Sequence, residues 1–176
     1  MNKLLLSLLF LVTSLVSVSQ DVPQFAKYAI SSSGCYAYFP VNPGSFEIQK
    51  SEDSLNMYIG KASFGDAFYY LILVDLGTVF IDSEKDELNN LLTQYLDFLQ
   101  TQYKITRTAG YGMGHIMESN PKATGVIDFW EDENNYQYDI KAWADNHFLV
   151  VLMVYSVEEV NYNYKSLFLN GFRFPE

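Results

Sequence analysis

Cysteine is almost absent from this sequence: Cys35 is the only one, so no disulfide can form within the chain. A cysteine nucleophile needs a neighbouring base that lowers the pKa of its thiol. Cys35 instead follows an SSSG stretch at the start of a strand pattern. We therefore expect a free thiol without a catalytic role, in a fold that is stabilised by an ordinary apolar core.

Histidine is nearly as scarce, with His115 and His147 as the only two residues of this type. Zinc sites use three or four ligands, and two of them usually stand at a short spacing such as H-x-x-x-H or C-x-x-C. Neither spacing occurs here. We expect both histidines to be structural or solvated, with no bound metal, no cofactor and no catalytic set of nucleophile, base and orienting group.

Lysine and arginine are also few: 11 of them stand against 21 aspartates and glutamates, which gives a net charge of −10. No cluster of basic residues interrupts this acidity. Because such a surface repels polyanions, nucleic acid is not expected as a partner and an anionic lipid surface is disfavoured.

A long, mainly apolar leader is confined to the N-terminus. Residues 1–19 contain Lys3, an apolar stretch from Leu4 to Leu15 and small residues at Ser17 and Ser19, which is typical of a secretory signal peptide. We expect cleavage after Ser19 and export to the periplasm or the cell exterior, with no membrane span afterwards. No cysteine directly follows the apolar stretch, so a lipid anchor is not expected.

The remaining chain has a length that fits one domain with a sizeable core. Residues 20–34 are polar and lack a sustained periodicity, so they predict a flexible N-terminal arm. Residues 35–176 are expected to form a single α+β domain.

Strand patterns occupy most of that domain. Alternating patterns predict strands at 35–39, 45–50, 54–63, 103–109, 124–132 and 136–144. Two further runs, 67–76 and 147–155, are apolar on both faces, which is typical of central strands covered on two sides. Turns are expected at Glu52–Asp53, Gly65–Asp66, Asn120–Pro121, 131–135 and Asp145–Asn146.

Two helices complete the prediction. From Glu84 to about Gln102, apolar residues recur at intervals of three and four, and Ser83 is the expected N-cap. Ser156 and Glu159 form an S-x-x-E capping box, which predicts a short second helix that ends at Gly171.

This order of elements, with its Gly-x-Gly strand, the YQYDIKAW and HFLVVLMVYS pair and the closing FLNGFRF, resembles the PsbP/Mog1-like superfamily over about residues 35–174. The resemblance implies an α/β/α sandwich, an antiparallel sheet flanked by helices. It also implies a binding or assembly module outside the cytoplasm, since members are mostly non-catalytic: extrinsic photosystem subunits, a binder of a nuclear-transport GTPase and bacterial envelope proteins. No functional residue carries over, because no position matches a binding motif of those proteins.

The glycine-rich stretch GYGMGH, residues 110–115, invites comparison with a dinucleotide-binding loop. That loop needs G-x-G-x-x-G between a strand and a helix. Counting from Gly110 puts His115 at the third glycine position, and counting from Gly112 puts Met117 there. A β-bulge or a close backbone approach is the better interpretation.

Four acids near one turn, Asp128, Glu131, Asp132 and Glu133, raise the question of calcium. They lack the D-x-D-x-D-G pattern, and consecutive acids on an extended turn point in different directions. We expect a solvated hairpin tip, with weak calcium binding as the open alternative.

Aromatic residues are the last candidates: Tyr136, Tyr138, the NYNY run at 161–164, and above all Trp130 and Trp143. Trp143 shares the polar face of its strand pattern, so it is expected to face outward or to lie under a covering element.

The sequence leaves two functions open. The first is a secreted or periplasmic, non-catalytic binding or assembly module of the cell envelope, which contacts another envelope or secreted protein. The second is a soluble binder of glycans or small apolar ligands through Trp130 and Trp143.

Overall fold

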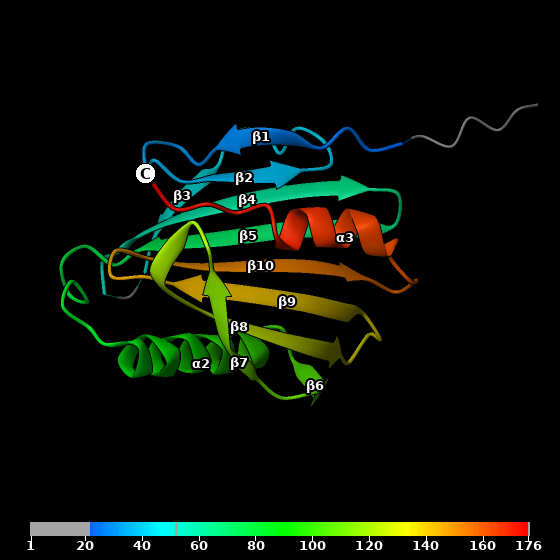
Figure 1. The fold of residues 1–176 in the computed structure, drawn as a ribbon. Helices are drawn as coiled ribbons and strands as arrows, with labels where there is room; N and C mark the ends of the chain where they lie inside the picture. The colour runs from blue at the N-terminus through cyan, green and yellow to red at the C-terminus, as the bar shows by residue number, and fades with distance from the viewer. Residues whose placement is uncertain (1–21, 52, 176) are drawn as a thin grey trace, which may run out of the picture.

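The computed structural model describes residues 22–51 and 53–175 (Figure 1). The expected signal peptide, residues 1–19, lies outside this part, and so does Glu52 of the first expected turn. The fold is α+β and mostly strand, as expected, with a large antiparallel sheet and two helices. No helix in the described part is long and apolar enough to cross a membrane.

The large sheet has eight strands in the order β3-β4-β5-β10-β9-β8-β6, and β7 also pairs with β8. Every neighbouring pair is antiparallel. The strands are β3 (Glu47–Lys50), β4 (Asn56–Phe64), β5 (Ala67–Asp75), β6 (Ile105–Thr108), β7 (Gly112–Met117), β8 (Asn120–Asp132), β9 (Gln137–Ala144) and β10 (Phe148–Ser156).

The two runs that are apolar on both faces, β5 and β10, lie side by side in the middle of the sheet, as predicted. In their register Leu71 is opposite Leu152 and Ile72 is opposite Val151. Leu71 and Leu152 belong to the core on one face, while Ile72 and Val151 belong to the core on the other. Both faces of the sheet must therefore be covered.

Helix α2 (Lys85–Gln102) covers one face of the sheet. Its buried stripe consists of Leu88, Leu92, Leu96 and Leu99. These side chains share a core with residues of β8, β9 and β10, and the helix packs against β6, β8 and β9. We call this side the α2 face.

The opposite side, which we call the α3 face, is covered by α3 (Tyr162–Leu169) and by a second, two-stranded sheet of β1 (Ala26–Ala29) and β2 (Tyr36–Phe39). Phe168 of α3 and Phe39 of β2 are fully buried in this core, and their ring centroids are 5.0 Å apart. Figure 1 shows β1, β2 and α3 lying along the half of the sheet that contains β4, β5 and β10.

The segment expected to be a flexible arm, 20–34, is structured in its described part. Residues 26–29 form β1, and Ile30 is completely buried against the sheet. The amide of Ile30 donates to the carbonyl of Cys35, so the connection between β1 and β2 is a closed turn. The polar composition of this segment did not predict a strand. Most residues of β1 are exposed, because the two-stranded sheet contacts the core with one face only.

Both predicted helix starts are wrong. The N-cap of α2 is Glu84 without a side-chain hydrogen bond, and not Ser83. The second helix begins only at Tyr162, where the side chain of Asn161 accepts from the amide of Asn163. Ser156 ends β10 instead, because its hydroxyl donates to the carbonyl of Asp66 across the β4–β5 turn.

The turns agree more closely with the sequence. Gly65 and Asp66 join β4 to β5 as expected. Asp145 shapes the β9–β10 turn by accepting from the amides of His147 and Phe148, each at 2.8 Å. The turn expected at Asn120–Pro121 lies one step earlier, at residues 118–119, and Asn120 already belongs to β8.

Gly125 of β8 gives a test of the packing on the α3 face. A Cβ atom at this position would overlap the ring of Trp143, which is directly opposite on β9. We expect Gly125→Ala to lower the free energy of unfolding by about 1–3 kcal/mol through overpacking, measured by urea denaturation. In a Trp143→Leu background the same substitution should cost less, and an equal cost in both backgrounds would contradict this contact.

Candidate functional site

The two tryptophans expected to bind a ligand are both buried, with exposed fractions of 2% for Trp130 and 5% for Trp143. Trp130 lies on the α2 face, where its indole N–H donates to the buried carboxylate of Asp128 at 2.5 Å. Its ring is therefore a core ring with a satisfied polar atom. The expectation of a stacking surface at Trp130 is corrected.

Trp143 lies on the α3 face under a covering element, the second of the two placements that its pattern allowed. One side of the ring contacts the backbone at Gly125, because no side chain intervenes there. The ammonium group of Lys141 lies 5.0 Å from the ring centroid. No open ring face is left on which a sugar could stack.

The four acids tested for calcium do not converge on one point. Glu131 pairs with Arg107 and Glu133 pairs with Lys104. The carboxylate of Asp132 accepts from the amides of Asn134 and Tyr136 and from the hydroxyl of Tyr138, which shapes the hairpin between β8 and β9. The carboxylate of Asp128 accepts a hydrogen bond from the indole N–H of Trp130. Within the described residues no group of three His, Cys, Asp or Glu side chains could hold a metal ion.

The glycine-rich stretch forms β7, a bulged strand, as predicted. Its register with β8 shifts on both sides of His115, and Gly114 has a φ of +85°. A Cβ on Gly112 would press against Ile127, so this glycine permits a close approach of the two strands. His115 is half-buried in β7 and His147 is exposed in the β9–β10 turn, on two separate hairpins.

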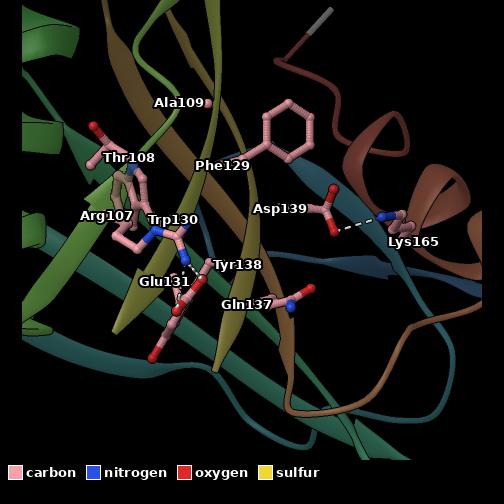
Figure 2. A pocket seen from close by; sticks show the side chains of 10 residues that line it. All are labelled: Arg107, Thr108, Ala109, Phe129, Trp130, Glu131, Gln137, Tyr138, Asp139 and Lys165. Carbon is pink, nitrogen blue, oxygen red and sulfur yellow. Dashed lines mark hydrogen bonds and ion pairs between the residues drawn. The ribbon is translucent and has the colours of Figure 1, made fainter. Parts of the chain in front are cut away.

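A groove that the sequence did not indicate lies on the α3 face, over β8 and β9. It contains an open hollow of about 380 Å³. Phe129 lies in it with 53% of its surface exposed, although it belongs to a strand. Figure 2 shows Phe129 and Asp139 projecting to the same side, toward Lys165 of α3. We call this region the β8–β9 groove.

Ion pairs stand at two sides of Phe129 in the groove. Arg107 of β6 and Glu131 of β8 approach to 3.2 Å, and Lys165 of α3 and Asp139 of β9 approach to 2.7 Å. The second pair is well shielded, with exposed fractions of 24% and 18% for its side chains. It ties α3 to the sheet and fixes the charged rim beside the phenyl ring.

The groove continues along α3 into a smaller hollow of about 180 Å³. Ile127 and Phe129 line it from the sheet, and Tyr162 and Leu169 line it from the helix. Tyr162 is 73% exposed. The groove thus combines exposed apolar side chains with two formed ion pairs, which suits non-covalent docking.

A second exposed feature is a row of aromatic rings on the α2 face. Trp130, Tyr138, Tyr155 and Phe68 lie directly opposite one another on β8, β9, β10 and β5. The rings of Tyr138 and Tyr155 are stacked at 4.9 Å, and those of Tyr155 and Phe68 at 5.0 Å. We call this row the aromatic ladder. Its outer member, Phe68, is 38% exposed.

An open hollow of about 470 Å³ adjoins the outer end of the ladder. Phe68, Tyr70, Tyr103 and Tyr155 line it, with Lys61 at its side. Burial and the nearby Tyr70 raise the pKa of Tyr103, so its phenol stays protonated at neutral pH. Neutral phenols beside ring faces can both stack and donate hydrogen bonds.

Cys35 has the surroundings of a structural thiol. It is 1% exposed, and burial raises the pKa of its thiol to about 12. We expect no reaction with Ellman's reagent at pH 8 in the folded protein, because the thiolate is both scarce and inaccessible. One equivalent should react after unfolding in guanidinium. Rapid labelling of the folded protein would contradict this placement of Cys35.

No protein-family model matches this chain. No curated protein matches it in sequence either. What the chain can bind must therefore follow from the β8–β9 groove, the aromatic ladder and the charges around them.

Proposed function

We propose that this chain is a secreted or periplasmic, non-catalytic binding module of the cell envelope that holds a protein partner in the β8–β9 groove. The observation that carries the proposal is Phe129, a strand residue with 53% of its surface exposed between two formed ion pairs. A ring held on a rigid strand loses little conformational entropy when a partner covers it.

The expected gain from covering Phe129 is moderate. Complete burial of a phenylalanine side chain is worth about 1.5–3 kcal/mol, so its exposed half contributes about 1 kcal/mol or somewhat more. Tyr162, Ile127 and Leu169 extend the apolar area along α3. Together they form the apolar centre that a protein interface needs, surrounded by a charged rim.

Charge favours an acidic partner segment at this place. The chain as a whole carries a net charge of −10, yet the lining of the groove includes Arg107, Lys141 and Lys165 against Glu131 and Asp139. An acidic segment that is repelled elsewhere on the molecule can approach here. Rim charges of this kind act mainly on orientation and on the association rate.

The layered arrangement supports the same proposal. Helices on both faces of an antiparallel sheet suit an α/β/α sandwich of the PsbP/Mog1-like kind, and that resemblance implies a binding or assembly module outside the cytoplasm. A site on one face of the sheet fits such a role.

The chain offers a matched pair of substitutions for testing the groove. Phe129 and Phe98, on the outer side of α2, are exposed to 53% and 51%. A photo-cross-linker at Gln137 should capture one dominant protein in the source cells, and the purified partner should bind at least tenfold more weakly to Phe129→Ser, measured by calorimetry. Phe98→Ser should bind like the original protein.

Equal weakening by both substitutions would show that replacing any exposed phenylalanine lowers the affinity for the partner. Capture of the same protein from a cross-linker at Thr93 of α2, on the opposite face of the sheet, would place the interface elsewhere. Either result contradicts docking in the β8–β9 groove.

The aromatic ladder favours a second candidate, the binding of a glycan or a small apolar ligand. The sequence pointed to Trp130 and Trp143 for this role, whereas the accessible rings belong to Phe68, Tyr70 and Tyr155. A hollow beside stacked rings, with a lysine at its side, suits a sugar or an aromatic compound.

A thermal-shift screen with neutral saccharides and small aromatic compounds tests this candidate. A ligand present at one hundred times its Kd should stabilise the protein by about 2.7 kcal/mol. Phe68→Ala should abolish the shift, while Phe98→Ala should retain it. A melting temperature that stays constant across the screen would rule out the ladder as a binding site for these compounds.

A further inference from the structure

A small hollow lies beyond the end of the groove, between the β7–β8 turn and the segment that follows α3. Its volume is about 300 Å³, and its polar lining consists of Glu118, Ser119, Lys141, Asn170 and Arg173, with Trp143 beside them. We call it the Lys141 pocket. It shares Lys141 and Asn170 with the neighbouring hollow of the groove.

The two cations of this pocket differ from the others that line the α3 face. Arg107 and Lys165 each form an ion pair with a carboxylate. Lys141 and Arg173 form no ion pair with any residue that the structure describes. Two positive charges thus meet in one hollow of a strongly acidic protein without an acid in direct contact.

One residue, Asn170, holds both cations in place. The ammonium group of Lys141 donates to its side-chain oxygen at 2.6 Å, and the guanidinium of Arg173 donates to its carbonyl at 2.8 Å. The side-chain amide of Asn170 is itself fixed by the carbonyl and hydroxyl of Ser166. The positions of the two charges are therefore set before any ligand arrives.

Unused donors remain on both side chains. An ammonium group has three N–H donors and a guanidinium has five. Lys141 uses one of them on Asn170, and Arg173 uses only Nη1, on the carbonyls of Asn170 and Phe172. The Nε and Nη2 groups of Arg173 make no hydrogen bond within the described part of the chain. An oxyanion could accept from both cations at once.

The surroundings of Lys141 lower the pKa of its ammonium group. Burial and the charge of Arg173 both lower the pKa of its ammonium group. Two like charges that are partly removed from water repel each other, and a negative ligand between them would reverse the effect. The neighbouring Asp139 does not do so, because it is engaged by Lys165.

We propose that the Lys141 pocket binds a small oxyanion, such as inorganic phosphate or sulfate or a carboxylate group, between Lys141 and Arg173. The ring of Trp143 is covered by Gly125 and Lys141, so recognition depends on charge and hydrogen bonds and not on stacking. Glu118 lines the rim and opposes the anion, which limits the affinity. The site does not depend on a protein in the β8–β9 groove.

Nuclear magnetic resonance titration of the purified protein tests this site directly. Sodium phosphate, sodium sulfate and sodium acetate are added separately at constant ionic strength, with sodium chloride as the reference. We expect saturable shifts at Lys141, Asn170 and Arg173 with at least one of the three, and the ranking separates inorganic anions from carboxylates. Shifts that are linear in concentration, or that chloride reproduces, would overturn the proposal.

Substitutions locate the binding. Arg173→Gln and Lys141→Gln should each weaken the binding at least tenfold, while Glu118→Gln should strengthen it severalfold. Lys104→Gln, which removes a cation that is paired with Glu133 and lies outside the pocket, is the control and should leave the affinity unchanged. Equal affinities in the Arg173→Gln and original proteins would overturn the assignment.

A second measurement does not depend on any variant keeping its stability. The pKa of Lys141, followed through the ¹³Cε resonance of its side chain, should rise when the preferred anion saturates the pocket. Chloride at the same ionic strength should not raise it. A pKa that is unaffected by all three anions would contradict binding between the two cations.

Discussion

The structure depends on one constraint: β5 and β10 are apolar on both faces, so the sheet must be covered on both sides. Leu71 and Leu152 need one cover, and Ile72 and Val151 need the other. A single helix lies on the α2 face, while a short helix and a two-stranded sheet share the α3 face. Burial of these side chains is the main favourable contribution to a fold without disulfides.

The two covers are displaced from each other, and both surface features follow from that displacement. Helix α2 lies under β6, β8 and β9, which leaves the rings of Phe68 and Tyr155 partly open beyond its end. The cover of the opposite face is centred on β5 and β10, which leaves Phe129 of β8 open. Each face of the sheet is thus packed over most of its area and partly open at the limit of its cover. Binding surfaces arise at these limits without any loop having to provide them.

Hydrophobic periodicity predicted the strands and the long helix because it reports which faces are buried. It could not identify the cover of Trp143, since that depends on Gly125 being opposite on the neighbouring strand. The aromatic ladder was hidden for the same reason: Phe68, Tyr155 and Tyr138 become one row only in the observed register. Ser156 misled the start of the second helix, because its hydroxyl donates to the carbonyl of Asp66 and does not cap a helix. The exposure of Phe129 could not be predicted from the sequence either, because it depends on how much of β8 the helix α3 covers.

The backbone link between Tyr36 and Arg173 has a consequence for biosynthesis. The amide of each residue donates to the carbonyl of the other, at 3.1 Å and 2.9 Å. The segment that follows α3 is therefore joined to the first residue of β2. Phe172 and Phe174 enter the same core as Phe39. Contacts between such distant parts of a sequence form late. A nascent chain that still lacks residues 172–174 cannot form these contacts, so the cover of the α3 face is completed only after they have been synthesised.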